Sequence, residues 1–166
     1  MSNQIEQIDQ LTQAAVKEVF QSMLCMEVNP EAPSPLTADP EGEIIGSVGF
    51  IGEATGIIYL YAGIGFARVI TSRLLGISVA EVDTGEMVTD AIGELSNMVV
   101  GYVKSRLCDH GLACTLTIPS VVRGQQLRVE GSAQAARRAI GFRNCQYHLL
   151  AEIMLKAPTA KESHEH

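Results

Sequence analysis

The segment D-A-I-G-E-L-S-N-M-V-V-G-Y-V-K-S-R-L, residues 90–107, has the periodicity of an α-helix that is buried on most sides. At ~100° per residue, its apolar side chains spread over well over half of the helix circumference. These side chains are Ala91, Ile92, Leu95, Met98, Val99, Tyr102 and Val103. One narrow stripe is left, formed by Asp90, Glu94, Asn97, Gly101 and Lys104. The segment therefore predicts a core helix that shows only this stripe to its surroundings.

The stripe and its neighbourhood contain residues that a purely structural helix would avoid. Gly93 and Gly101 lie in the helix interior, where each glycine costs ~1 kcal/mol relative to alanine. Asparagine has poor helix propensity because its amide competes for backbone hydrogen bonds, so Asn97 is unusual on a solvated face. Without a side chain at Gly101, the surface one turn beyond Asn97 is flat, and another backbone can approach it.

Each of these features also has a structural explanation. A crowded helix crossing would account for Gly93 and Gly101, and Glu94 followed three residues later by Asn97 is a common pair by chance. The functional interpretation depends on the combination of a carboxylate, a carboxamide and a flattened next turn on the polar stripe of a buried helix.

The N-terminal part of the chain predicts a helix followed by an extended connector. Residues 4–27 have amphipathic helical spacing, and Ser2 or Asn3 is suited to cap the helix. Residues 29–42 contain four prolines, which exclude a helix there. We interpret this Pro-rich segment as a linker inside one domain.

The middle of the chain predicts a β-hairpin and two helices. The strands Glu43–Ile51 and Gly56–Tyr61 flank a short turn segment. Phe66–Leu75 has helical spacing, and a longer helix is expected over about Gly85–Cys108. Asp83 and Glu86 are interpreted as an acidic capping pair at its start, and His110-Gly111 as its end.

The C-terminal part of the chain predicts strands. The short turn between the two preceding strands favours an antiparallel sheet with helices packed against it. We expect a single α/β (α+β) domain over residues 1–156. Residues 157–166 are expected to form a disordered tail. The expected strands are residues 113–118, 121–122, 126–130 and 142–155, with residues 132–140 as a connection that can hold a helical turn.

The composition indicates a single cytoplasmic domain with an aliphatic core. The chain has 166 residues, 46% of them apolar, and no tryptophan. Its net charge of −7 argues against nucleic acid or an anionic membrane as the main partner. No segment is long and apolar enough to span a bilayer, and residues 1–10 have no features of a signal peptide.

The cysteines and histidines predict no metal site. None of the four cysteines forms a C-x-x-C pair, so we expect buried, reduced thiols rather than a disulfide or a redox pair. No pair of histidines has the spacing of metal ligands within a regular element.

Residues 94–107, E-L-S-N-M-V-V-G-Y-V-K-S-R-L, resemble the signature helix of the CheC/CheX/FliY chemotaxis phosphatase family, with its E-x-x-N core, a downstream glycine and a Lys-Ser pair. Residues 115–124, T-L-T-I-P-S-V-V-R-G, are similar to the family's strand-Pro-Val-Val-Gly step. Residues 56–76 resemble its strand and helix ending in Leu-Leu-Gly. CheC-type members carry two E-x-x-N helices, whereas this chain has one, so it resembles the CheX branch.

This resemblance implies a CheC-like fold that forms a homodimer through its sheet. It also implies a phosphatase that removes the aspartyl phosphate of a CheY-like response-regulator receiver domain and so terminates a chemotaxis signal. Asn97 would position the attacking water, and Glu94 would pair with a basic residue of the receiver's active site. Asp90, Gly101 and Lys104 are expected to contact the partner. No cofactor of the chain's own is expected, because the receiver domain holds the Mg²⁺.

Other functions compete with this one. A catalytically silent protein of the same fold would bind receivers or act as a dimeric scaffold, and a pure dimerisation module would bind none. Residues 62–68 begin like a dinucleotide-binding G-x-G motif, but Arg68 stands where its third glycine belongs, so that function is excluded. Asp90 and Lys104 also fit a solvated helix face with no partner.

Overall fold

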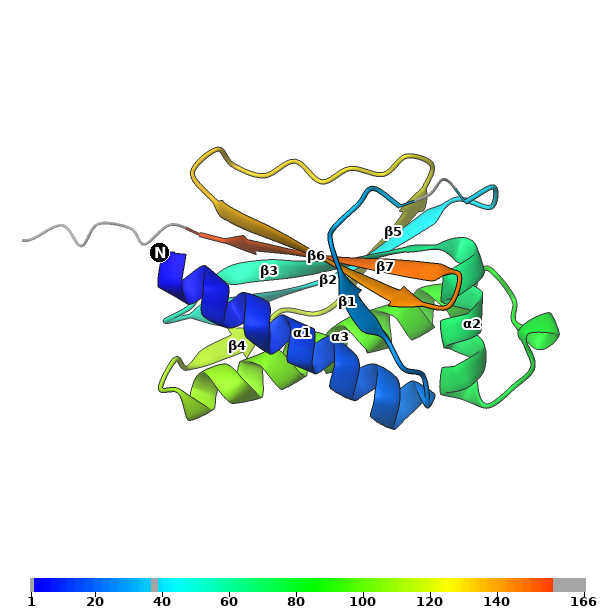
Figure 1. The fold of residues 1–166 in the computed structure, drawn as a ribbon, viewed down its shortest axis with the longest axis horizontal. Coiled ribbons are helices and arrows are strands. Elements are labelled where there is room, and N and C mark those ends of the chain that lie inside the picture. Colours follow the sequence, from blue (N-terminus) through cyan, green and yellow to red (C-terminus); the bar gives the residue numbers. More distant parts are fainter. Residues whose placement is uncertain (1, 37–38, 157–166) are drawn as a thin grey trace, which may run out of the picture.

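The computed structural model, which describes residues 2–36 and 39–156, has a seven-stranded antiparallel sheet with α-helices packed against it (Figure 1). The strand order is β1-β6-β7-β3-β2-β4, and β5 also pairs with β2. The predicted fold class is confirmed. The strands are β1 (Asn29–Glu31), β2 (Glu43–Gly52), β3 (Gly56–Gly63), β4 (Cys114–Leu116), β5 (Ser120–Gly124), β6 (Ala136–Asn144) and β7 (Tyr147–Leu155). The helices are α1 (Ser2–Leu24), α2 (Ile64–Leu75), the short 3₁₀ helix η1 (Val79–Glu81) and α3 (Glu86–Asp109).

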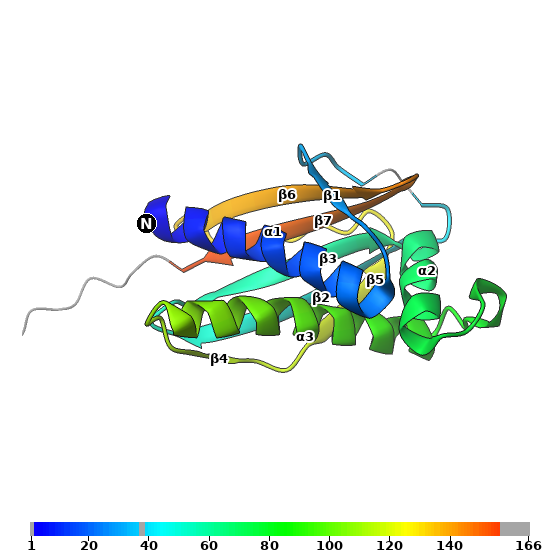
Figure 2. The ribbon, with the colours of Figure 1, turned by 60° about the horizontal axis from the view of Figure 1, so that its bottom comes forward.

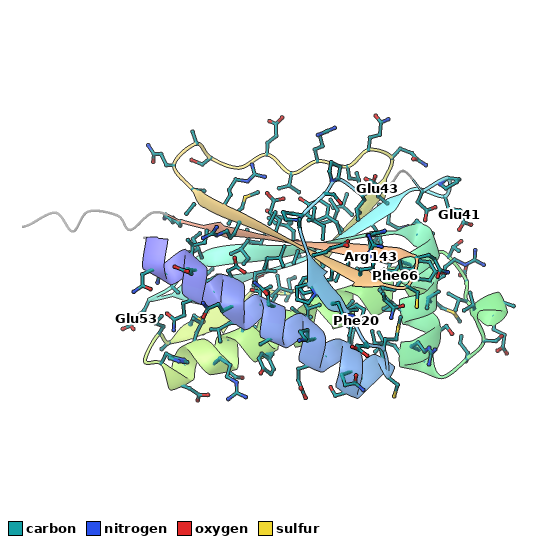
Figure 3. The ribbon with its side chains drawn as sticks, viewed as in Figure 1. Phe20, Glu41, Glu43, Glu53, Phe66 and Arg143 are labelled. Carbon is teal, nitrogen blue, oxygen red and sulfur yellow. The ribbon has the colours of Figure 1, made fainter. Side chains whose placement is uncertain are left out.

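The helices α1 and α3 lie side by side on one face of the sheet (Figures 1 and 2). α1 contacts β6 and β7, whereas α3 contacts β2, β4 and β5. Alternate strand residues point into this layer, so Val48, Ile58 and Ile153 are in register across three strands and at most 1% exposed. Figure 3 shows Phe20 of α1 near Phe66 of α2, with ring centroids 6.1 Å apart.

A close approach between β2 and α3 fixes the position of α3 on the sheet. A Cβ atom at Gly46 would overlap the hydroxyl of Ser96 and would lie 2.9 Å from Cγ2 of Ile92. Ser96 is fully buried, and its hydroxyl donates a hydrogen bond of 2.8 Å to the backbone oxygen of Ile92. The sheet therefore holds α3 directly against a strand that has no side chain at the point of contact.

Local sequence signals predicted the middle of the chain correctly. The hairpin is confirmed as β2 and β3, which extend slightly beyond the predicted strands. The helix predicted over Phe66–Leu75 is confirmed as α2, which begins at Ile64. It ends at Gly76, whose φ of 67° lies in the left-handed region that favours glycine.

The N-terminal segment differs from its prediction in three details. α1 already includes Ser2, so neither Ser2 nor Asn3 precedes the helix as a cap. The helix ends three residues before the predicted end, because Cys25 adopts a positive φ of 50°. The Pro-rich segment 29–42 contains β1, which pairs with β6 at the edge of the sheet.

The predicted capping pair at the start of α3 is wrong. Gly85 occupies the N-cap position, and no side chain caps the helix there. Asp83 instead accepts a hydrogen bond from the backbone nitrogen of Gly85 at 3.1 Å. The capping box is instead formed by Ser78 and Glu81 at η1, where the side chain of each residue bonds to the backbone nitrogen of the other. α3 ends at Asp109, as the sequence indicated.

The predictions for the C-terminal strands are wrong in part. Residues 126–130 form no strand, whereas the expected connection 132–140 contains the start of β6. The single strand expected over 142–155 is instead part of the β6–β7 hairpin, in which Asn144 pairs with Tyr147. Cys145 makes this tight turn with a φ of 49°, a conformation that cysteine rarely adopts and that the sequence does not signal.

The prediction of buried cysteines is also wrong for most of them. Cys114 on β4 is buried, but Cys25, Cys108 and Cys145 are exposed. Each exposed cysteine lies in or next to the end of a helix or in a turn, where the apolar neighbours in sequence point elsewhere. The predicted disordered tail, 157–166, lies outside the described residues.

Candidate active site

The polar stripe of α3 faces outward. Asp90 and Glu94 are exposed, and Asn97, Gly101 and Lys104 are half-buried. The opposite side of the helix is buried against the sheet, where Leu95, Val99, Val100 and Val103 are 0% exposed. The 3.6-residue period thus places all five predicted site residues along one accessible face, while the core holds the other face in place.

Glu94 and Asn97 are available for contacts with another molecule. Within residues 2–36 and 39–156, neither side chain makes a hydrogen bond or an ion pair. Residues three apart on a helix have Cβ atoms about 5–6 Å apart, so one ligand can contact both. A free carboxylate and a free carboxamide at this spacing offer acceptors and donors to one bound group.

The surface beyond Asn97 is open. Apart from the adjoining backbone of α3 itself, a Cβ atom at Gly101 would have no described atom within 4 Å, so crowding by another element does not account for this glycine. Gly93 differs, because its Cβ would lie 3.5 Å from Cγ2 of Val121 and 3.9 Å from Cβ of Pro119. The connection between β4 and β5 therefore packs against the side of the stripe at Gly93, and the space at Gly101 stays free.

The C-terminal turns of α3 differ on their two sides. On the side of α1, the guanidinium of Arg106 lies 5.2 Å from the centre of the Tyr102 ring, a cation–π contact. On the side of β4, burial raises the pKa of the Cys114 thiol, and the charge of the nearby Lys104 opposes that rise. Lys104 therefore stands at the margin between the stripe and β4.

A pocket lies elsewhere in the molecule. It has a volume of about 270 Å³ and is formed where the N-terminus of α2 meets the β6–β7 turn. None of its lining residues belongs to α3; they are Leu36, Asp39, Pro40, Gly63, Phe66, Gln146, Tyr147 and His148. In the part of the chain that the structure describes, no three His, Cys, Asp or Glu side chains gather as metal ligands. The open stripe on α3 is suited to a protein surface rather than to a small molecule.

Sequence reasoning missed a charged cluster next to this pocket. The carboxylate of Glu31 on β1 accepts hydrogen bonds from Nδ1 of His148 at 2.7 Å and from Nε of Arg143 at 2.9 Å. These bonds lower the pKa of Glu31 below its ordinary value, and the bond from His148 has the larger effect. Glu31 is more than 100 positions from both Arg143 and His148 in sequence, and the pairing of β1 with β6 brings it to them. They fasten the linker segment to the sheet.

Residues 44–143 match the family described as chemotaxis phosphatase CheX, a range that contains all of α3. This chain belongs to the CheX family. No curated protein sequence matches it. In the described residues, no helix has the length and apolar character needed to cross a membrane.

Solved structures of CheX-like proteins have the same fold. The chemotaxis protein CheX from Vibrio vulnificus is 24% identical with a TM-score of 0.78, over 90% of this chain and 96% of that one. A CheC-like superfamily protein from Shewanella sp. PV-4 is 24% identical with a TM-score of 0.77, over 91% and 98%. The CheX–CheY–BeF₃–Mg²⁺ complex from Borrelia burgdorferi matches at 21% identity and a TM-score of 0.73, over 89% and 97%. At these identities the likeness shows the CheC-like fold and leaves the roles of single residues as predictions.

Proposed function

We propose that this CheX-family protein hydrolyses the aspartyl phosphate of a CheY-like receiver domain and so terminates a chemotaxis signal. The observation that carries the proposal is the outward face of α3, where Glu94 and Asn97 stand without partners among the described residues. The family assignment supports the reaction class. The complex from Borrelia burgdorferi supports the class of partner, because it pairs a CheX with a CheY.

In the proposed reaction, a water oxygen attacks the phosphorus atom, and the bond from phosphorus to the aspartate oxygen breaks. Inorganic phosphate leaves, and the receiver regains a free carboxylate. Asn97 holds the water in line with the breaking bond, because its carboxamide both accepts and donates hydrogen bonds. A neutral amide adds no negative charge beside the phosphoryl group, whereas a carboxylate at this position would repel it.

The other residues of the stripe bind the receiver. Glu94 forms a charge-assisted hydrogen bond with a basic side chain near the phosphorylated aspartate. The free space at Gly101 allows the receiver's backbone to approach the helix. Asp90 and Lys104 contact the partner at the two ends of the stripe. The Mg²⁺ that stabilises the phosphoryl charge belongs to the receiver, and no residue of this chain is assigned to it.

We also propose that the chain forms a homodimer through its sheet and acts in the cytoplasm, where receiver domains are phosphorylated. The helices cover one face of the sheet, and apolar side chains such as Ile51 and Val122 are 58% and 55% exposed elsewhere on it. Such residues favour an additional covering surface. A mass of twice 17.8 kDa in light scattering is expected, and a monomer at micromolar concentration contradicts the dimer.

The test of the reaction follows the decay of phosphorylated receiver domains from the same genome. The wild-type chain should accelerate the decay of at least one receiver, and Asn97→Ala should return it to the spontaneous rate. Glu130→Gln is the matched control, because Glu130 is an exposed carboxylate in the connection between β5 and β6 and does not lie on α3. It should keep most of the activity.

One outcome would contradict the role of Asn97, and another would contradict the phosphatase assignment itself. If Asn97→Ala hydrolyses as fast as wild type, this side chain does not position the water. If neither protein accelerates decay but both bind the receiver, the chain is a silent receiver-binding scaffold of the same fold.

A further inference from the structure

The edge of the sheet beside α3 contains a β-bulge. β4 pairs with residues 50–52 of β2, and β5 pairs with residues 43–47 of the same strand. Between them, residues 117–119 stand opposite only residues 48–49, so the edge carries one extra residue. Bulges of this kind interrupt a ladder and turn a side chain away from its regular position, and they are common next to active sites.

The backbone of the bulge is held firmly by β2. The backbone nitrogen of Thr117 donates to the oxygen of Gly49 at 2.9 Å, and the nitrogen of Gly49 donates to Oγ1 of Thr117 at 2.9 Å. The same hydroxyl donates to the backbone oxygen of Ile118 at 3.2 Å. The lack of a side chain at Gly49 permits this fit, because a Cβ there would lie 3.0 Å from Cγ2 of Thr117. The position of Ile118 is therefore fixed from one side by three hydrogen bonds.

The bulge adjoins the candidate active site. Pro119 follows Ile118 and packs beside Gly93, the residue before Glu94 on α3. Figure 2 shows the connection from β4 to β5 running along α3. A molecule that covers Glu94 and Asn97 will also meet this connection.

Ile118 is an unusual surface residue. Its side chain is 85% exposed, and the next most exposed large apolar side chain in the described residues is Ile51 at 58%. Single exposed apolar residues are common, so exposure alone decides nothing. Here the residue is held in a fixed backbone, comes directly before Pro119, which packs beside Gly93 of α3, and contributes nothing to the core. Protein interfaces usually combine an apolar core with a rim of polar groups, so an exposed apolar side chain near accessible polar residues fits such a surface.

We propose that Ile118 is a docking and specificity residue of the receiver-binding surface. Its side chain packs against an apolar part of the receiver domain beside the phosphorylated aspartate, and Pro119 forms the adjoining part of this contact. The proposal rests on the proposed function, because the occupant is the receiver domain that Glu94 and Asn97 engage. Ile118 selects which receiver binds, whereas Asn97 performs the chemistry.

The experiment measures binding separately from hydrolysis. Receiver domains from the same genome, activated with beryllofluoride and Mg²⁺, are titrated with the wild-type chain and with Ile118→Ser, Ile118→Val and Val79→Ser. Val79→Ser is the matched control, since Val79 is an exposed β-branched residue of η1, away from the sheet edge that carries the bulge. We expect Ile118→Ser to raise Kd by about tenfold, as for the loss of a central apolar contact, and the other two variants to change it less than about twofold.

Kinetics provide the second readout. With phosphorylated receiver, Ile118→Ser should raise KM and leave kcat near that of wild type, whereas Asn97→Ala should abolish kcat. An unchanged Kd and KM for Ile118→Ser overturn the docking proposal while the loss of activity in Asn97→Ala still supports the phosphatase. Weaker binding by Ile118→Ser together with full activity of Asn97→Ala supports docking and overturns the catalytic role of Asn97. Weaker binding by Ile118→Ser with no hydrolysis by the wild-type chain supports docking and overturns the phosphatase assignment. A change in oligomeric mass in Ile118→Ser with unchanged receiver binding assigns the residue to a contact between two copies of the chain and overturns the proposal.

Discussion

Replacing Gly46 by alanine should destabilise the protein strongly, because the added methyl group would project from β2 into α3. The new Cβ would lie 2.9 Å from Cγ2 of Ile92 and 3.1 Å from its backbone oxygen, and it would overlap the hydroxyl of Ser96. The Ser96 side chain is fully buried and hydrogen-bonded, and the backbone oxygen cannot rotate away. The contact can be relieved only if α3 moves away from the sheet.

Overpacking of a core usually costs ~1–3 kcal/mol, and a displaced helix belongs at the upper end, so we expect a loss of about 3 kcal/mol. For a chain of this length, that loss lowers Tm by about 6–12 °C. Urea denaturation followed by circular dichroism measures the free energy of unfolding directly. Because α3 carries Glu94 and Asn97, the variant should also lose phosphatase activity at urea concentrations well below its unfolding midpoint.

A second substitution tests the assigned contact. Ser96→Ala removes the hydroxyl that the new Cβ overlaps, so Gly46→Ala with Ser96→Ala should be less destabilised than the sum of the two single variants. The Ile92 contacts remain, and recovery should therefore be incomplete. A loss below ~1 kcal/mol for Gly46→Ala, or strict additivity of the pair, would refute the reasoning.

The remaining predictions concern α3 and the linker. Gly101→Ala should stabilise the protein by ~0.5–1 kcal/mol, because the new methyl group meets open space within a helix, yet it should weaken receiver binding. A stabilised variant with unchanged Kd would exclude close approach at this point. Acid should weaken the attachment of β1, because the hydrogen bonds of Glu31 lower its pKa from 4.5 in the folded state. Its stabilising effect is complete above that ordinary value and disappears as pH falls through the lowered pKa. The difference in unfolding free energy between wild type and Glu31→Gln should therefore shrink as pH falls below 4.5, and a difference independent of pH would contradict the assignment.

The elements that sequence analysis predicted well are those with local signals. β2 and β3 are joined by a short turn, and α2 is followed by a glycine in the left-handed region. α3 has a periodicity that identifies both its buried side and its exposed stripe. The stripe was thus predictable as a surface from residue spacing alone, whereas the roles of Glu94 and Asn97 came from the family resemblance.

The elements that were missed depend on contacts between distant residues. Arg137 and Arg138 made the start of β6 look like a charged connection, but each of them, like Arg143, pairs with a carboxylate from another element. Arg137 pairs with Glu152 of β7, Arg138 with Asp9 of α1, and Arg143 with Glu31 of β1. No window of local sequence contains both members of such a pair.

The bulge at Ile118 could not be predicted for the same reason. The extra residue can be recognised only by comparing this edge with β2, its partner strand. The two are far apart in sequence: Gly49 of β2 bonds to Thr117, 68 positions later. The sequence shows a proline after an isoleucine, which fits an ordinary loop equally well. Only the register of two strands on β2 identifies the interruption and its place beside α3.

The bulge also limits how copies of this chain can aggregate. An open sheet edge presents unpaired backbone groups on which further strands can add repeatedly, as in amyloid. Here one edge is broken between β4 and β5 and carries Pro119, which has no backbone hydrogen to donate. The opposite edge is β1, a strand of three residues with Pro30 at its centre. Within the described residues, the border at β4 and β5 is therefore too irregular to serve as a template for fibre growth, whereas on the opposite border residues 136–140 of β6 extend beyond β1 without a strand partner.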